Sequence, residues 1–307
     1  MKHKIEYLIA GCFIQLVRLL PLGVGVWLGG IIGSLYHWID PKHRRLAIDH
    51  LHRAFGDKKD LQTIKQMAWD SCKNMGMSIA ESIHLPSLDR AAVTQWVDID
   101  GLEHYVEANQ RGKGVIILTA HLGNWEIIPK GFWSVGYCIN AVVRPLDNPY
   151  LDRVVQDWRR KNGMGVLNKR TDVHRIMTLL RAGETVGFLL DQNTVEQDAV
   201  FVDFFGQKAA THKGPALLAL RSGAAVIPVF AIREGSRHRI IIEKPLPLVR
   251  TKSNANDILQ ATALFTKTIE LVVARYPAQW LWIHRRWKTQ ETRNRSSPAI
   301  DEGQSTP

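Results

Sequence analysis

Four histidines in this sequence of 307 residues are followed five positions later by a carboxylate, and such a pair could perform acid–base chemistry. A neutral imidazole has a pKa of about 6.5, so it can take a proton from a hydroxyl group at neutral pH. A carboxylate on the other ring nitrogen fixes the tautomer and stabilises the imidazolium that forms. The four pairs are His52/Asp57, His84/Asp89, His121/Glu126 and His238/Glu243. Because the spacing also arises by chance, the surroundings of each pair must decide which could be catalytic.

The surroundings favour His121, which directly follows the apolar run GVIILTA at 114–120. That run is typical of a central strand, and open α/β sheets bind their ligands at the carboxyl ends of their strands. The pair His52/Asp57 lies on a basic helix that runs into a turn, and the pair His84/Asp89 lies at a helix end. His238 and Glu243 lie on opposite faces of one expected strand. Pro129 cannot lie deep in a helix, so the next helix must begin near 124–126, with Glu126 at its start. His121 therefore lies on a tight loop between a strand and a helix.

Two interpretations of this pair remain open on the residues alone. In the catalytic interpretation, His121 is a general base and Glu126 is the carboxylate that orients it. In the structural interpretation, His121 is a loop residue with satisfied hydrogen bonds, and Glu126 stabilises the positive end of the helix dipole. The residue types and their spacing favour neither over the other.

The elements that would position these residues are short apolar strands alternating with helices. Runs rich in Val and Ile predict strands at 114–120, 139–144, 185–190 and 224–232, with a further strand at 238–246. Helical spacing predicts helices at 43–57, 60–84, 126–134, 148–161, 171–182, 212–222 and 255–275. Strands that alternate with helices indicate an α/β fold, in which helices cover both faces of a largely parallel sheet.

The N-terminal region is unusually apolar. Residues 19–39 (LLPLGVGVWLGGIIGSLYHWI) carry no formal charge and are long enough to cross a bilayer as a helix. Pro21 and several glycines also fit a re-entrant or surface-lying pair of helices, or a glycine-rich pair packed in the core. A cleaved signal peptide does not fit, because the run is too long and no A-x-A-like site follows it. We expect residues 1–40 to attach the protein to a membrane, and the basic residues that follow predict that the rest faces the cytoplasm.

The composition is that of an ordinary folded protein with an acidic partner. Hydrophobic residues make up 45% of the chain, and its formal net charge is +11. Nucleic acid, an anionic membrane face and an acidic carrier protein would each match that charge. The basic residues are scattered, without zinc-finger spacing or an RNP-like strand, so nucleic acid is not expected as a partner. Cys12, Cys72 and Cys138 are far apart, which argues against a disulfide framework and against a zinc site.

Taken together, these segments resemble a known family. HLGNWE (121–126) looks like the H-x-x-x-x-[DE] signature of glycerolipid-type acyltransferases, and residues 5–289 are similar to the bacterial lipid A biosynthesis acyltransferases. The motifs that carry the resemblance are HRRLAIDHLHRAF, GVIILTAHLGNWE, VVRPLDNPYLD, GFLLDQN, FFGQKAATHKGPALLALRSGAAVIPVF and PAQWLWIHRRWK. Each motif is only moderately specific, whereas their order and spacing together are specific. Glu126 replaces the aspartate of the phospholipid branch, as is usual in the lipid A branch.

The resemblance implies acyl transfer from an acyl carrier protein thioester to a hydroxyl of a lipid A precursor, on the cytoplasmic side of the bacterial inner membrane. The implied fold is the α/β fold of the glycerolipid acyltransferases. His121 would take the hydroxyl proton and Glu126 would orient His121, so neither a covalent acyl-enzyme nor a metal or cofactor is required. Backbone N–H groups near Glu126 could stabilise the tetrahedral oxyanion.

Three further residues match positions where the family has functional residues. Arg144 ends the expected strand at 139–144, at the same sheet edge as His121, and Arg159 lies in the DNPYLDRVVQDWRRKNG block. Both would bind acidic groups of the acceptor, with a solvated helix end as the alternative for Arg159. Asp191, at the end of GFLLDQN, would orient an arginine or the acceptor, with a structural turn as the alternative.

The motif PAQWLWIHRRWK mixes tryptophans with cations, which fits either a lipid headgroup interface or a buried closing segment. We divide the chain into a membrane-anchoring segment (1–40), an acyltransferase domain (41–290) and a polar, disordered tail (291–307). Three other functions remain open. One is a transferase of the same fold that acylates another glycolipid or aminolipid. Another is a non-catalytic membrane protein that binds anionic lipid. The third is a thioester hydrolase, since water can replace the acceptor at a histidine base.

Overall fold

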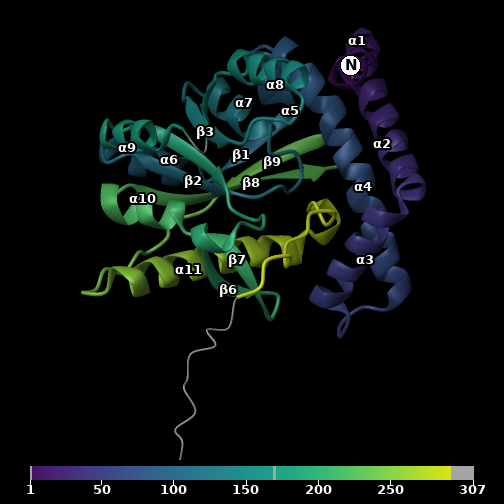
Figure 1. Ribbon diagram of the computed structural model, residues 1–307. Coiled ribbons are helices and arrows are strands. Elements are labelled where there is room, and N and C mark those ends of the chain that lie inside the picture. The colour runs from purple at the N-terminus through teal and green to yellow at the C-terminus, as the bar shows by residue number, and fades with distance from the viewer. Residues whose placement is uncertain (1, 169–170, 292–307) are drawn as a thin grey trace, which may run out of the picture.

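The structure is a computed structural model that describes residues 2–168 and 171–291. Within these residues, seven strands form one sheet in the order β1-β9-β8-β2-β5-β3-β4 (Figure 1). The strands are β1 (Val97–Asp100), β2 (Val115–Thr119), β3 (Ile139–Val143), β4 (Met164–Asn168), β5 (Thr185–Leu189), β8 (Ala225–Glu234) and β9 (Arg237–Ile242). β8 and β9 are antiparallel, and all other neighbouring pairs are parallel. The expected α/β fold with a largely parallel sheet is therefore confirmed.

Helices cover both faces of the sheet because its central strands are apolar on both faces. One face is covered by α9 (Val173–Arg181), α10 (Gly214–Ser222) and α11 (Asn254–Arg275), and the other by α5 (Arg90–Trp96), α6 (Leu102–Gln110) and α7 (Ile127–Ser134). In β2, Ile116 and Leu118 belong to the first core, whereas Val115 and Ile117 belong to the second. All residues of β2 are buried, as expected for a central strand.

The elements that the sequence did not predict are short or lie at the edges. They are β1, β4, α5, α6 and a hairpin of β6 (Ala199–Phe204) and β7 (Gln207–His212), which packs on α11. β1 and β4 are the two edge strands of the sheet and are only partly buried, so their apolar patterns are weak. β9 ends at Ile242, before the predicted residue 246, and Pro245 in the remaining stretch has no N–H to donate to a sheet.

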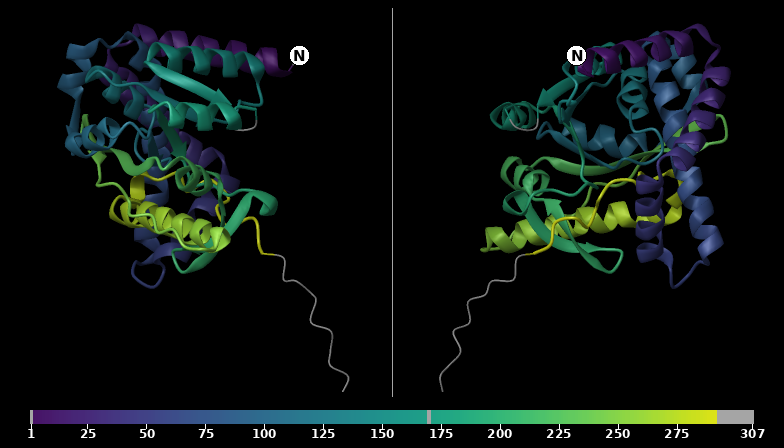
Figure 2. Two further views of the ribbon diagram at one scale, coloured as in Figure 1. Left: turned by 90° about the vertical axis from the view of Figure 1, so that its left-hand side faces the viewer. Right: turned by 45° about the vertical axis from the view of Figure 1, so that its right-hand side comes forward.

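Helices α1 (Lys2–Leu19), α2 (Leu22–Ile39), α3 (Pro41–Phe55) and α4 (Leu61–His84) form a layer beside the sheet (Figure 1, Figure 2). α2 lies along α4, and glycines allow this close approach. A Cβ atom on Gly29 would lie 2.5 Å from the carbonyl oxygen of Gly76, and one on Gly33 would overlap the carbonyl oxygen of Cys72. α2 is thus not separate from the rest of the chain, since one of its faces is packed on α4.

The other face of α2 exposes large apolar side chains. Trp27, Ile31, Leu35 and Trp38 share this face, and the two tryptophans are 65% and 66% exposed. Judged by length and composition, α2 is the one helix among the described residues that could cross a membrane. The tail predicted to be disordered lies outside the described residues from 292 onward.

Candidate active site

His121 and Asp191 meet because their strands are neighbours in the sheet. β2 and β5 are parallel, and Thr119 lies opposite Leu189. The backbone N–H of Leu190 donates to the carbonyl oxygen of Thr119 at 3.1 Å, so the pairing continues past the strand ends. Two residues beyond each strand, this register places His121 beside Asp191.

The Asp191 carboxylate holds the imidazole of His121. Its Oδ1 accepts from His121 Nδ1 at 2.8 Å, and its Oδ2 accepts from the His121 backbone N–H at 2.9 Å. Trp280 Nε1–H also donates to Oδ2, at 2.7 Å. Burial alone would raise the pKa of Asp191, but the charge of His121 and these hydrogen bonds outweigh burial and hold the pKa at about 2. An ionised carboxylate on Nδ1 leaves the lone pair on Nε2, the nitrogen that can act as a base.

Glu126 has a different partner from the one expected. Arg159 donates to the Glu126 carboxylate from Nη2 at 2.5 Å and from Nε at 3.2 Å, and both side chains are about one-fifth exposed. Burial acts to lower the pKa of Arg159, but the Glu126 carboxylate outweighs it and raises that pKa. The structure therefore differs from the expectation that Glu126 orients His121, because the order of the strands brings Asp191 to the ring instead. Arg159 is an ion-pair partner and not a solvated helix end.

A cavity of about 610 Å³ lies beside these side chains. Its polar part is lined by His121, Glu126, Arg159 and Gln192. Below the strand ends its wall is apolar and is formed by Ile117, Ile128, Pro129, Ile139, Met164 and Gly187. An acid–base pair at the sheet edge above a long apolar wall fits a reactive group that is joined to a hydrocarbon chain.

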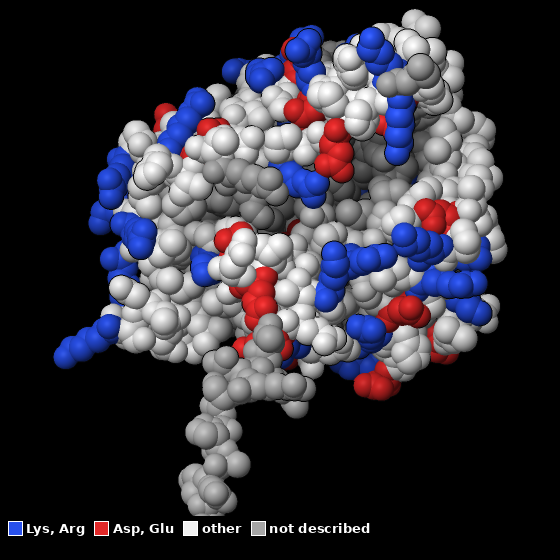
Figure 3. Space-filling model, viewed as in Figure 1, with Lys and Arg blue, Asp and Glu red and all other residues white. Residues whose placement is uncertain are grey.

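Arg144 lies at the rim of this cavity, directly after β3. Its Nη2 donates to Asp147 Oδ1 at 2.8 Å, and its side chain is 73% exposed. Figure 3 shows lysine and arginine side chains spread over one face of the molecule, whose centre is hollowed. Arg144 is an exposed cation at the rim of the cavity.

Metal-binding side chains do not gather in the described part of the chain. Within residues 2–168 and 171–291, no group of three or more His, Cys, Asp or Glu side chains could hold a metal ion. Cys12, Cys72 and Cys138 are free thiols, and burial raises the pKa of Cys72 to about 11. The polar side chains that line the cavity carry imidazole, carboxylate, guanidinium, amide and hydroxyl groups.

Comparison with known proteins shows the family to which this chain belongs. Residues 2–289 match the family model of the bacterial lipid A biosynthesis acyltransferases. The chain belongs to this family. The resemblance drawn from the sequence motifs is confirmed, and acyl transfer in lipid A biosynthesis is the activity that the family supports.

Three similar proteins illustrate the range of the match. The lipid A biosynthesis palmitoleoyltransferase of Escherichia coli K12 is 28% identical over 276 residues, which cover 88% of this chain and 87% of that protein. The phosphatidylinositol mannoside acyltransferase of Mycolicibacterium smegmatis is 25% identical over 213 residues, 67% of each chain. The crystal structure of the 1-acyl-sn-glycerophosphate acyltransferase of Thermotoga maritima aligns with a TM-score of 0.39 and 14% identity, over 83% of this chain and 99% of that one.

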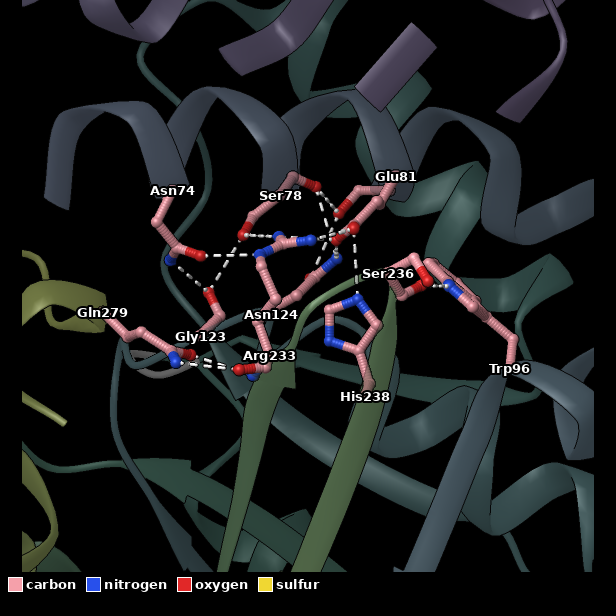
Figure 4. Close-up of polar contacts among 11 residues, drawn as sticks. Asn74, Ser78, Glu81, Trp96, Gly123, Asn124, Arg233, Ser236, His238 and Gln279 are labelled. Carbon is pink, nitrogen blue, oxygen red and sulfur yellow. Dashed lines mark hydrogen bonds and ion pairs between the residues drawn. The ribbon is translucent and has the colours of Figure 1, made fainter. Parts of the chain in front are cut away.

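In this acyltransferase a buried polar network fixes the loop that carries His121 (Figure 4). The carbonyl oxygen of Gly123 accepts from Ser78 Oγ at 3.0 Å and from Asn74 Nδ2 at 3.4 Å, both on α4. The Gly123 N–H donates to the carbonyl oxygen of Gln279 at 2.9 Å. Gly123 has a φ of +58°, and a Cβ atom there would overlap the carbonyl oxygen of Ala231, so only glycine fits.

Glu81 is the centre of this network (Figure 4). Its carboxylate forms a two-point ion pair with Arg233 of β8, accepts from Asn124 Nδ2 at 2.9 Å, and lies 3.1 Å from His238 Nε2 of β9. The Glu81 side chain is only 2% exposed. Burial would raise the pKa of Glu81, but His238 and Arg233 outweigh it and hold the pKa at about 2. The Glu81 carboxylate thereby connects helix α4, strands β8 and β9, and the loop that carries His121.

Residues 279–289, here called the C-terminal strap, contact both loops of the site. The backbone N–H of Leu281 donates to the His121 carbonyl oxygen at 3.1 Å, and Trp280 contacts Asp191. Four large side chains of the strap are buried, and they are Trp280, Trp282, Arg286 and Trp287. The lipid headgroup interface is therefore the wrong alternative for these side chains, and the buried closing segment is the correct one.

Sequence reasoning missed Glu81, Arg233 and the contacts of the strap. Charged residues within helix and strand patterns normally face solvent, so neither Glu81 nor Arg233 stands out. One signal was available on α4. Asn74, Ser78 and Glu81 recur at spacings of four and three residues, which places three polar side chains on one helix face.

Proposed function

We propose that this chain transfers a fatty acyl group from an acyl carrier protein thioester to a hydroxyl of a lipid A precursor, with His121 as the general base. Membership of the family supports acyl transfer in lipid A biosynthesis. One observation carries the assignment of the base. The buried Asp191 carboxylate accepts from His121 Nδ1 and leaves the Nε2 lone pair at the wall of the cavity.

His121 would move one proton in each direction during the reaction. The acceptor hydroxyl gives its proton to Nε2 while its oxygen attacks the thioester carbonyl carbon, and the carbonyl oxygen becomes an oxyanion. When this intermediate collapses, the carbon–sulfur bond breaks and the imidazolium returns the proton to the thiolate. Gln192 Nε2, which lies 3.4 Å from His121 Nε2, occupies the place that the hydroxyl would take. The products are an ester and a free thiol, so neither a metal nor a cofactor is needed.

Arg159 is suited to bind a phosphate of the acceptor. Its Nε and Nη2 are engaged by Glu126, whereas its Nη1 has no hydrogen-bond partner among the described residues. Both side chains line the cavity, so Glu126 would hold the guanidinium in one orientation for a planar, two-point contact. Arg144 would add a second cation at the rim. In this proposal Glu126 acts through Arg159, and Asp191 orients the base.

Attachment to the inner membrane through the N-terminal helices is the second part of the proposal. The exposed apolar face of α2 can be buried in lipid, while its glycine face stays on α4. Basic residues at 42–53 follow α2 directly, which favours a cytoplasmic position for the rest of the chain. A net charge of +11 would attract both an acidic carrier protein and the phosphates of the acceptor.

Another glycolipid as acceptor is the alternative that one observation favours. The relative from Mycolicibacterium smegmatis is a phosphatidylinositol mannoside acyltransferase that matches 67% of this chain. The same base and the same acyl donor would serve either acceptor, because only the contacts of the acceptor with the cavity rim would differ.

The direct test compares acceptors. Purified membranes that contain the chain are incubated with isotopically labelled acyl carrier protein thioester and with either a lipid A precursor or a phosphatidylinositol mannoside, and the products are identified by mass spectrometry. We expect the label in an ester of the lipid A precursor. Label only in the mannoside would favour the alternative acceptor, and label only in free fatty acid would contradict a transferase.

A further inference from the structure

A second histidine, His284, lines the same cavity as His121. It belongs to the C-terminal strap, which holds the segment after β5 by hydrogen bonds to successive residues. Trp280 Nε1 donates to Asp191, Arg286 Nη1 donates to the carbonyl oxygen of Gln192 at 3.3 Å, and His284 contacts Asn193. His284 is therefore fixed to the same segment that supplies the carboxylate for His121.

The hydrogen bond with Asn193 sets the tautomer of His284. A backbone N–H can only donate, and that of Asn193 donates to His284 Nε2 at 2.9 Å. Nε2 therefore carries the lone pair, and the proton of the neutral ring is on Nδ1. The one side-chain hydrogen bond of His284 within the described residues is this contact through Nε2, so the Nδ1–H has no acceptor there. The neutral ring of His284, which lines the cavity, thus carries one hydrogen-bond donor that no other described residue uses.

The His284 ring also stays neutral at physiological pH. Burial is the largest influence and lowers its pKa to about 4, and the charges of His121 and Arg286 act in the same direction, while Asp191 opposes them. A neutral imidazole neither repels an imidazolium at His121 nor competes with it for the hydroxyl proton. Such a ring can donate a hydrogen bond to an oxygen on which negative charge develops.

We propose that His284 is a further catalytic residue, whose Nδ1–H donates to the thioester carbonyl oxygen and stabilises the oxyanion. This inference rests on the proposed function, because it requires attack on a thioester at His121. The C-terminal strap contains His284 and also bonds to His121, because Leu281, three residues before His284, donates its N–H to the His121 carbonyl oxygen. The donor and the base are therefore held by one segment. No proton leaves His284 in the reaction, since the Nδ1–H bond is kept while the oxyanion forms and collapses.

The test removes the donor and keeps the contact with Asn193. Incorporation of Nδ1-methylhistidine at position 284 replaces the N–H by a methyl group and leaves Nε2 free to accept. With the full chain, acyl carrier protein thioester and lipid A precursor, kcat should fall by about 10²–10³-fold, the usual loss for one oxyanion donor. Both KM values and the unfolding temperature should stay unchanged. Thioester hydrolysis without acceptor should fall by the same factor, because it forms an oxyanion at the same oxygen.

Two substitutions and one control separate the donor from a packing role. His284→Gln offers an amide oxygen to Asn193 and an N–H to the substrate, so it should be faster than His284→Leu. Nδ1-methylhistidine at the exposed His174 of α9 is the matched control and should leave kcat unchanged. A methylated His284 with near-native kcat would overturn the inference. So would a loss of kcat that is accompanied by a lower unfolding temperature, or a His284→Gln as slow as His284→Leu.

His121→Ala in the same assay distinguishes this inference from the proposed function. If the wild-type protein transfers no acyl group, or if His121→Ala transfers it at the native rate, the proposed function itself fails. If His121→Ala is inactive while the methylated His284 protein is fully active, only the role of His284 is refuted.

Discussion

Changing Asp191 to asparagine keeps the shape of the side chain but removes its charge. An amide can donate to Nδ1 and so stabilise the wrong tautomer of His121, with the proton on Nε2, which then cannot act as a base. We expect Asp191→Asn to lower kcat by about 10⁴-fold, as in other sites where a carboxylate orients a catalytic histidine. Initial rates of acyl transfer, with circular dichroism as the check on folding, measure this effect.

Glu126→Gln is the matched control for this prediction. Because Glu126 bonds to Arg159 and not to His121, its loss should chiefly raise KM for the phosphorylated acceptor. If Glu126→Gln lowers kcat as strongly as expected for Asp191→Asn, while Asp191→Asn does not, then Glu126 is the residue that orients His121.

At this scale the sequence motifs singled out residues that lie close together in the structure, but the expected contact between His121 and Glu126 is not formed. The residues that stood out because they follow strands or lie in a motif are His121, Arg144, Arg159 and Asp191. Which carboxylate reaches His121 depends on strand order, and β5 lies beside β2 although β3 and β4 come between them in the chain. Spacing along the chain cannot reveal that neighbourhood.

The contact between α2 and α4 depends on glycines that leave no room for a side chain. A Cβ atom on Gly33 would overlap the Cys72 carbonyl oxygen, so Gly33→Ala should separate the helices and lower the free energy of unfolding by about 1–3 kcal/mol. Gly23, on the same helix, has nothing within 4 Å of such an atom. Gly23→Ala should therefore be neutral or stabilising by up to about 1 kcal/mol. Equal stability of the two variants in denaturant unfolding would refute this packing.

The Glu81 network should make the free energy of unfolding depend on pH. The pKa of Glu81 is about 2 in the folded protein against an ordinary 4.5, so its ionised form stabilises the fold above pH 4.5, and this contribution is lost as the pH falls towards 2. Glu81→Gln should weaken that dependence. At neutral pH, Glu81→Gln should lower the free energy of unfolding by about 3–5 kcal/mol, because the Arg233 charge is left buried without its partner. Denaturant unfolding at several pH values measures both effects.

An exposed ion pair supplies the comparison for Glu81. Asp98, 54% exposed, pairs with Arg237 on the adjacent strand. Asp98→Asn should change the free energy of unfolding by less than about 1 kcal/mol, since solvent screens an exposed pair. A similar loss of unfolding free energy in Glu81→Gln and Asp98→Asn would mean that the Glu81 charge does not hold the network together.

At the scale of elements, the sequence predicted the central strands and most long helices, and it missed the edges. β2, β5 and β8 are buried on both faces, which gives continuous apolar runs that are easy to detect. The edge strands β1 and β4 have mixed patterns in short segments. Pro21 separates α1 from α2, so only Leu19 of the uncharged run at 19–39 lies in α1, and residues 22–39 form α2.

For the whole molecule, the exposed face of α2 should decide where the protein resides. Replacing Trp27 and Trp38 together by glutamate places charge on that face and leaves the glycine contacts with α4 intact. We expect the double variant to shift from the membrane fraction to the soluble fraction after carbonate washing, with its unfolding temperature preserved. A double variant that remains with the membrane would show that another surface anchors the chain.

The central claim is that His121 removes the proton from the acceptor hydroxyl. The most direct measurement is the rate of acyl transfer from labelled acyl carrier protein thioester to a lipid A precursor by His121→Ala, beside the wild-type protein. Transfer should be lost while the circular dichroism spectrum and the binding of the thioester are kept, because no other side chain bonded to Asp191 is a base. Near-native turnover by the folded His121→Ala protein would contradict it.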